Sequence, residues 1–276
     1  MKELFSFFTD YSFIQNAIIA GLLSSIACGI SGTFVVVKKI SYLSGGIAHA
    51  IVGGLGIAYF LGINPLYGAL AFSIVSALLI GTVKLKLKQN EDTLISALWA
   101  VGMSIGLIFA YLTPGYNVNL LSYLFGNILL VSSESIYLML VLDIFISAIV
   151  IILYKQFIYV CFDEEYAYLR GIKVELIYIL LLIMISLTIV VLVQSVGLVL
   201  VIALLTLPSS IARMFSNTIW KMILISIILI QIFTFAGFAF SFSTNLPSGA
   251  SIILAAGLGY LLSFFIQSFL RRNTIK

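Results

Sequence analysis

Apolar residues run through the chain in five long stretches that contain no Asp, Glu, Lys or Arg. These stretches comprise residues 11–37, 40–83, 93–133, 176–212 and 222–270. A helix needs about 20 apolar residues to cross the hydrocarbon core of a bilayer. The shortest stretch can therefore hold one membrane helix, and each longer stretch could hold two.

Turn-forming residues divide the four longer stretches. The divisions fall at residues 62–65, 113–115, 194–195 and 243–249. The remaining apolar segment, residues 120–131, is too short to cross the bilayer and is predicted to be interfacial or re-entrant. The pattern thus predicts about nine membrane helices, over residues 12–37, 40–61, 66–83, 94–112, 133–154, 176–193, 197–213, 221–241 and 249–269.

Composition agrees with a membrane protein. Hydrophobic residues make up 62% of the 276 residues and charged residues only 9%, whereas soluble domains carry about 25% charged residues. No stretch is polar enough for a soluble domain, so we expect residues 1–276 to form one all-α transmembrane domain. Cys28 and Cys161, placed in a helix and in an internal loop, are interpreted as packing residues and not as a disulfide.

The basic residues predict the orientation. With nine helices and an external N-terminus, all of the 14 Lys and Arg residues except Lys2 fall on the internal side, as the positive-inside rule requires. These residues are spread over short loops and form no single patch. The positive charge therefore indicates contact with anionic lipid and gives no reason to expect nucleic acid.

His49, the only histidine, lies about midway between Lys39 and Gly62 and so near the bilayer midplane. Ionisable residues at that depth are costly and usually face a pathway or a partner. A neutral imidazole is also a good ligand for transition metals. His49 is therefore a candidate metal ligand, and the alternative is a histidine that is hydrogen-bonded to a neighbouring helix for packing.

Asp143 is the only carboxylate in the middle of a predicted helix, 9 residues after Glu134 and 12 before Lys155. Its depth therefore matches that of His49. A carboxylate at this depth must find a proton, a cation or a hydrogen-bond donor. Asp143 is a candidate pathway residue, and the alternative is a protonated residue that serves helix packing.

One long internal loop, residues 154–175, contains the pattern of a helix of about two turns. Asp163 suits the N-cap, and Gly171 suits the C′ position, where a left-handed conformation is common. Glu164 and Arg170 suit the two ends of the helix dipole. The segment is either a connector on the membrane surface or a coupling helix that docks on a cytoplasmic motor.

The coupling interpretation rests on apolar side chains that a simple connector does not need. They are Tyr166, Tyr168 and Leu169. The chain also lacks a glycine-rich phosphate loop with its Lys-Ser/Thr, so we do not expect it to bind ATP itself. With one histidine it has no zinc-protease His pair, and no serine triad is evident, so we do not expect an enzyme.

Six blocks of the chain, in order, resemble the permease family of zinc/manganese/iron ABC importers. They are GTFVVVKKISYLSGGIAHA at 32–50, EDTLISALWAVGMSIGL at 91–107, SYLFGNIL at 122–129, FDEEYAYLRGIKVE at 162–175, VGLVLVIALLTLPSSIAR at 196–213 and NLPSGASIIL at 245–254. The resemblance covers nearly the whole chain. It implies a fold like that of type II ABC importers and a place in the bacterial cell membrane.

The resemblance also implies what this chain works with. The expected assembly is a homodimer with two copies of a cytoplasmic ABC ATPase below it and an extracellular metal-binding protein above it. The expected cargo is a divalent zinc, manganese or iron ion, and no cofactor is bound by this chain. The resemblance places the coupling role on residues 162–171 and a pathway role on His49.

The chain departs from the family pattern at one position. Many members carry an aspartate four residues before this histidine, and the residue here is Gly45. A carboxylate–imidazole pair on one helix face is therefore missing. We hypothesise that Asp143 supplies the negative charge from another helix.

Three other classes remain as alternatives. The first is a permease for metal chelates such as haem, siderophores or cobalamin, although those permeases are usually longer by a helix. The second is an ATP-independent secondary transporter, for which two mid-membrane ionisable residues offer little as a proton relay. The third is an intramembrane enzyme.

Overall fold

A computed structural model describes residues 12–87, 91–113, 131–244 and 246–274. Within these ranges every regular element is a helix, which confirms the all-α prediction. The elements are α2 (Ser12–Lys38), α3 (Ser41–Phe60), α4 (Pro65–Thr82), the π-helix η1 (Val83–Leu87), α5 (Glu91–Leu112), α7 (Ser133–Phe162), α8 (Glu164–Leu169), α9 (Val174–Val196), α10 (Leu198–Phe215), α11 (Ile219–Thr244) and α12 (Ser248–Thr274).

The helices match the predicted membrane spans. In the described part of the chain, eight helices are long and apolar enough to cross a bilayer, and α10 adds a shorter apolar stretch over Leu200–Phe215. The turn residues act as expected at the start of α4, where the Asn64 side chain accepts a hydrogen bond from the Leu66 N–H at 3.0 Å. Pro65 follows at the first helical position, where its missing N–H costs nothing.

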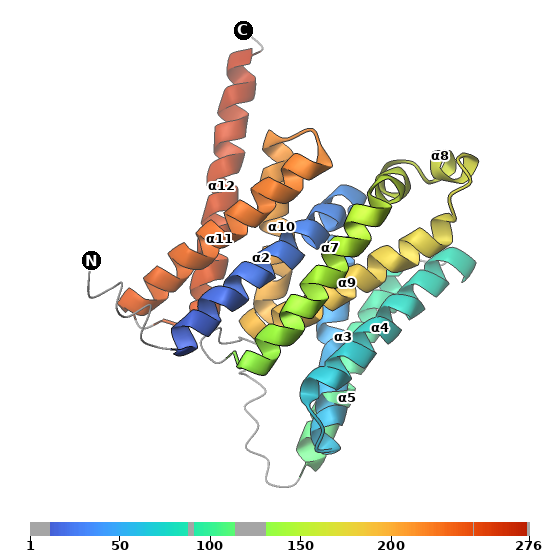
Figure 1. Cartoon of the computed structure of the whole chain (residues 1–276), viewed down its shortest axis with the longest axis vertical. Helices are drawn as coiled ribbons and strands as arrows, with labels where there is room; N and C mark the ends of the chain where they lie inside the picture. The colour runs from blue at the N-terminus through green and yellow to red at the C-terminus, as the bar shows by residue number, and fades with distance from the viewer. Residues whose placement is uncertain (1–11, 88–90, 114–130, 245, 275–276) are drawn as a thin grey trace.

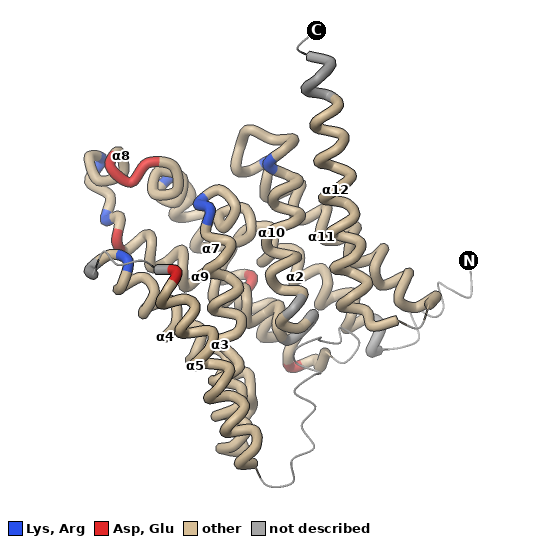
Figure 2. The backbone as a smooth tube through the Cα atoms, turned by 180° about the vertical axis from the view of Figure 1, so that it is seen from behind, with Lys and Arg blue, Asp and Glu red and all other residues tan. Residues whose placement is uncertain are grey.

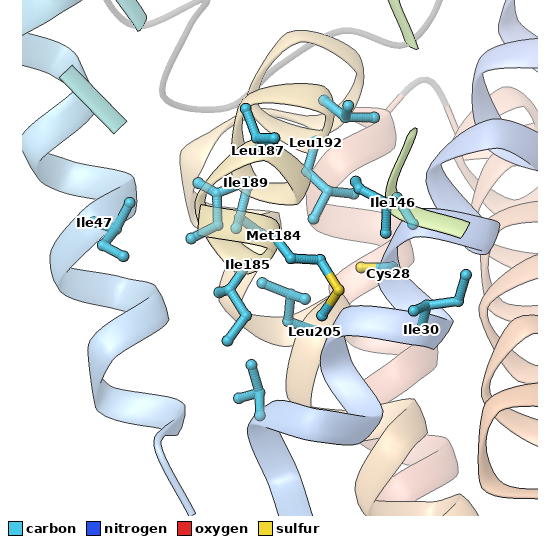
Figure 3. Packing of buried hydrophobic residues seen from close by; sticks show 14 of the residues in the cluster. Cys28, Ile30, Ile47, Ile146, Met184, Ile185, Leu187, Ile189, Leu192 and Leu205 are labelled. Atoms are coloured by element: carbon cyan, nitrogen blue, oxygen red, sulfur yellow. The ribbon is translucent and has the colours of Figure 1, made fainter. Parts of the chain in front are cut away.

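The membrane helices differ in how much of their surface the rest of the chain covers. The apolar windows of α2, α3 and α9 are each 78% buried within the chain, whereas those of α5, α7 and α12 are 22% buried. Figure 1 shows α3, α4 and α5 together on one side and α2, α11 and α12 on the other, with α7 and α9 between them. Figure 3 shows Met184 and Ile185 of α9 in one cluster with Cys28 and Ile30 of α2.

The charged residues mark one end of the bundle. Figure 2 shows the Lys and Arg positions gathered at the end that carries α8. This is the end predicted to face the cytoplasm, because the positive-inside rule puts basic loops there. The basic residues therefore separate the two ends of the bundle as the sequence predicts.

One boundary prediction is wrong. The helix predicted over residues 133–154 continues to Phe162, so Cys161 lies in α7 and not in a loop. The helix kinks at Leu153 (φ −103°, ψ 17°) and then turns Phe157 and Val160 fully inward. The helix continues past Lys155 because the charged side chain is exposed there and needs no break in the helix.

One further sequence prediction can be compared with the structure, and another falls almost wholly outside the described residues. Cys28 and Cys161 are both buried and free, in agreement with their interpretation as packing residues. The predicted interfacial or re-entrant segment, residues 120–131, lies outside the described residues except for Val131.

Candidate translocation and coupling sites

Glycines bring α3 and α5 into backbone contact around His49. A Cβ atom built on Gly53 would lie 2.9 Å from the Gly102 carbonyl oxygen, and one built on Gly56 would lie 2.7 Å from the Gly106 Cα atom. Real Cβ atoms do not approach that closely, so only glycine fits these positions. Small residues that let helix backbones touch replace the hydrophobic driving force that lipid does not supply. The α3–α5 contact therefore forms a rigid support for His49.

His49 projects from α3 onto an aromatic residue of α5. Its imidazole stacks on the Trp99 ring with the centroids 4.3 Å apart and the planes inclined by 4°. The side chain is half-buried, and the buried Nδ1 atom has no hydrogen-bond partner among the residues that the structure describes. The alternative role, a packing histidine hydrogen-bonded to a neighbouring helix, would need a bond from the other ring nitrogen. A held imidazole with an unused nitrogen is suited to brief metal ligation.

The position one turn before His49 faces α10. A Cβ atom on Gly45 would lie 3.1 Å from Ile202 Cδ1. No carboxylate stands beside the imidazole on this face of α3. Among the described residues there is also no group of three or more His, Cys, Asp and Glu side chains that could hold a metal. Within the described ranges, the geometry around His49 provides an imidazole without a closed set of metal ligands.

Asp143 lies in a different part of the bundle. Its side chain on α7 is 3% exposed, and neither carboxyl oxygen has a hydrogen-bond partner in the described ranges. Because α7 packs against α2 and α9, while α3 packs mainly against α4, α5 and α9, the structure does not bring Asp143 and His49 together within one chain.

The short helix α8 has the caps that the sequence predicts. Asp163 Oδ1 accepts a hydrogen bond from the Tyr166 N–H at 2.9 Å. Gly171 has φ 75°, and its N–H donates to the Tyr168 carbonyl while the next N–H donates to the Ala167 carbonyl. These two bonds form the Schellman motif that ends many helices. A six-residue helix is too short to be stable alone, so the caps help to fix it.

The outer face of α8 is apolar and uncovered. Leu169 is 83% exposed and Tyr168 is 76% exposed, although Ala167 on the opposite face is fully buried. The Arg170 guanidinium donates to the Tyr166 hydroxyl at 2.9 Å and lies over its ring. An open groove of about 940 Å³ continues from α8 along the start of α9, lined by Tyr168, Leu169, Gly171, Ile172, Lys173, Val174, Glu175, Leu176, Ile179 and Leu180.

Two residues with clear roles in this geometry were missed at the sequence level. Trp99, which stacks on His49, was one apolar residue among many in its helix, and no signal in the sequence links the two. Lys38 was counted only as a topological charge, yet its Nζ atom lies 2.6 Å from Glu164 Oε1 of α8. The two residues are 126 positions apart, so no local pattern could have paired them.

The whole fold is similar to that of a solved structure. A chain of PsaBC from Streptococcus pneumoniae, solved in complex with Fab, matches at a TM-score of 0.88 and 28% identity, with 99% of both chains covered. A manganese transport system membrane protein, MntC, of Halalkalibacterium halodurans is 33% identical over 270 residues, which are 97% of this chain and 92% of the relative. An uncharacterized membrane protein of Synechocystis sp. is 45% identical over 254 residues, 92% of this chain and 90% of the relative.

The apolar bundle, with its basic end and the capped helix α8, defines a multi-pass transport permease of the bacterial inner membrane. The family model described as the ABC 3 transport family matches residues 10–267. The chain therefore belongs to the ABC 3 transport family, and the predicted resemblance is confirmed.

Proposed function

We propose that this permease forms the membrane pathway of an ATP-driven importer of divalent metal ions, with His49 as the residue that contacts the ion in mid-membrane. The observation that carries this proposal is the His49 Nδ1 atom, which is buried without a hydrogen-bond partner in the described structure, on a helix that has no charged residue. A polar nitrogen left unpaired at this depth is costly unless a passing ligand uses it. A transported ion also requires a weak site, which one imidazole provides better than a closed tetrahedral set.

We propose manganese as the cargo to test first, because relatives of this chain are named manganese transport proteins. Zinc and iron form a second candidate class, for a different reason. Manganese prefers carboxylate, carbonyl and water oxygens, whereas an imidazole suits zinc and iron. The lack of a carboxylate at Gly45 therefore favours the softer ions.

The partners follow from the two ends of the bundle. The exposed apolar face of α8 and its groove are suited to a cytoplasmic ABC ATPase, and this chain would hydrolyse no ATP itself. An extracellular metal-binding protein would deliver the ion on the opposite side. We propose a homodimer, because His49 and Trp99 are only partly covered within one chain and a second copy would complete a closed pathway beside them.

A pathway role for Asp143 stays a separate proposal. Its carboxyl group is buried and unpaired in the part of the chain that is described, at the packing of α7 on α2 and α9. Its oxygens could therefore still bind a cation during transport. The packing of α3 away from α7 gives no support to a direct pair with His49 within one subunit. The two residues therefore need independent tests.

Uptake into proteoliposomes tests the proposed function. The permease is reconstituted with its ATPase and binding protein, and entry of manganese, zinc and iron is measured separately with and without ATP. ATP-dependent uptake of a free ion is the expected result. Uptake that needs no ATP would support a secondary transporter, and uptake of a chelate alone would support the chelate class.

The variant His49→Ala then tests the site. We expect it to abolish uptake with little loss of protein, because the α3–α5 glycine contact lies on positions other than 49. Trp99→Phe is the matched control, because it keeps an aromatic surface for the imidazole. Normal uptake by His49→Ala would remove the metal role of His49.

A further inference from the structure

The C-terminal end of α2 connects three other helices through polar bonds. The Lys38 Nζ atom lies 2.7 Å from the Val160 carbonyl oxygen of α7 and 2.6 Å from Glu164 Oε1 of α8. Its side chain is only 12% exposed, although it carries a charge. From α10, the Arg213 guanidinium donates to the Val36 carbonyl at 3.0 Å. One turn of α2 is therefore bonded to α7, α8 and α10.

The same turn leads directly into α3. The Ile40 N–H donates to the Val35 carbonyl, and the Lys39 N–H donates to the Val36 carbonyl. Lys39 has φ 62°, a left-handed conformation that a residue with a Cβ atom adopts only at a cost. These bonds fix a tight connection of two residues between α2 and α3. A movement of the α2 end must therefore move the start of α3.

The α3 helix then carries that movement to the candidate ion site. His49 lies eight residues after Ser41, about 12 Å further along the helix axis. The α3–α5 contact in this region is a close backbone contact, and closely packed elements transmit strain because they cannot deform continuously. A continuous set of contacts thus joins α8 to His49 through Lys38.

We propose that Lys38 is a positioning residue that transmits the movement of α8 to α3 and so couples the ATPase to the ion site. The proposal rests on the proposed function, because it assumes that α8 docks on an ATPase. Lys38 makes no contact with the ion. Its ion pair with Glu164 pulls on the Lys38 side chain when α8 moves. Its bond to the Val160 carbonyl keeps the same side chain attached to the end of α7.

The test uses the complete complex of permease, ATPase and binding protein in proteoliposomes. Manganese uptake and ATP hydrolysis are measured in the same vesicles, and the readout is the number of ions transported per ATP hydrolysed. For Lys38→Met, which keeps the length of the side chain but removes its charge, we expect this ratio to fall about tenfold, within the range typical of coupling between two sites. Lys38→Arg, which keeps a donor for both partners, is expected to restore most of it.

Two further variants separate coupling from simple anchoring. Glu164→Gln removes the charge of the Lys38 partner on α8 and keeps the size of its side chain. The Glu164 side chain is 44% exposed, so this change tests the ion pair without disturbing buried packing. We expect a smaller fall in the same ratio. Lys155→Met removes a basic charge from an exposed position on α7 and is expected to leave the ratio unchanged.

The outcomes distinguish this inference from the proposed function. If the wild-type complex transports no metal with ATP, both fail. If the wild type transports metal and Lys38→Met keeps the normal number of ions per ATP, only the role of Lys38 fails. A loss of protein and uptake in equal proportion in Lys38→Met and Glu164→Gln, with an unchanged ratio, would make Lys38 an anchor and overturn the proposal.

Discussion

The candidate mid-membrane residues His49 and Asp143 differ from the cytoplasmic end of the bundle in how their polar groups are bonded. His49 Nδ1 and both oxygens of Asp143 are buried without hydrogen-bond partners in the described structure. At the cytoplasmic end, Lys38 holds two partners at once. The contrast runs against the usual rule that buried polar groups are hydrogen-bonded and that exceptions need an explanation.

The difference fits two separate roles, contact with the ion in the middle of the bundle and linkage of helices at the cytoplasmic end. Under the proposed function, the unpaired groups of His49 and Asp143 leave bonding capacity for a passing ion, while close contacts of glycines with backbone hold α3 against α5. Paired groups at the cytoplasmic end use their bonding capacity to join helices. A transporter needs both, because its ion site must be weak while its link to a motor must be stiff.

The largest effect should come from breaking the packing in the middle. Gly56→Leu places a large side chain where even a Cβ atom would lie 2.7 Å from the Gly106 Cα atom. Overpacking of this kind costs about 1–3 kcal/mol or more when neither backbone can move. We expect little correctly inserted protein, measured as the yield of monodisperse permease after membrane extraction.

A matched glycine on α12 gives the control. A Cβ atom on Gly257 would meet nothing within 4 Å, and alanine favours a helix over glycine by about 1 kcal/mol. Gly257→Ala should therefore be neutral or slightly stabilising in a thermal aggregation assay. If Gly56→Leu and Gly257→Ala behave alike, the glycines of α3 do not hold the middle together.

The next largest effect should fall on the cytoplasmic end. Leu169→Asp puts an unpaired charge into an apolar contact, which costs roughly 2–3 kcal/mol, and this corresponds to about 30- to 150-fold weaker binding of the ATPase. Co-purification of the tagged ATPase measures it. Since Leu169 is exposed in the free chain, the variant should still insert and dimerise, and normal co-purification would return α8 to the connector role.

The smallest effect should come from Asp143. The variant Asp143→Asn keeps the volume of the side chain and removes its negative charge. We expect a fall in metal uptake that is smaller than that of His49→Ala, because α7 packs on α2 and α9 and away from the face that carries His49. Uptake assays in the same vesicles compare the two variants. Normal uptake would assign Asp143 to packing between α2 and α7.

Depth and order along the chain could be predicted from the sequence. Stretches without charge and the turn residues between them located the spans, and Asp163 and Gly171 marked both ends of α8 because capping is a local property of the backbone. The prediction that His49 lies in mid-membrane rests on the same kind of count, between Lys39 and Gly62. These features depend on neighbours in the sequence.

The neighbouring helix that each side chain faces could not be predicted in the same way. Matching depth predicts that His49 and Asp143 meet, but depth says nothing about which neighbour a side chain faces. In the structure α7 packs on α2 and α9, whereas α3 packs mainly on α4, α5 and α9. The extension of α7 past Lys155 was missed because a charge on the exposed face of a helix does not end it. The Lys38–Glu164 pair depends on tertiary packing across 126 residues.

The central claim is that the middle of the bundle handles the ion and the cytoplasmic end handles the coupling. Manganese uptake and ATP hydrolysis, measured together in proteoliposomes that contain His49→Ala with the ATPase and the binding protein, test it most directly. The account predicts an assembled complex that hydrolyses ATP and imports no manganese. Import at the wild-type rate by His49→Ala would contradict it.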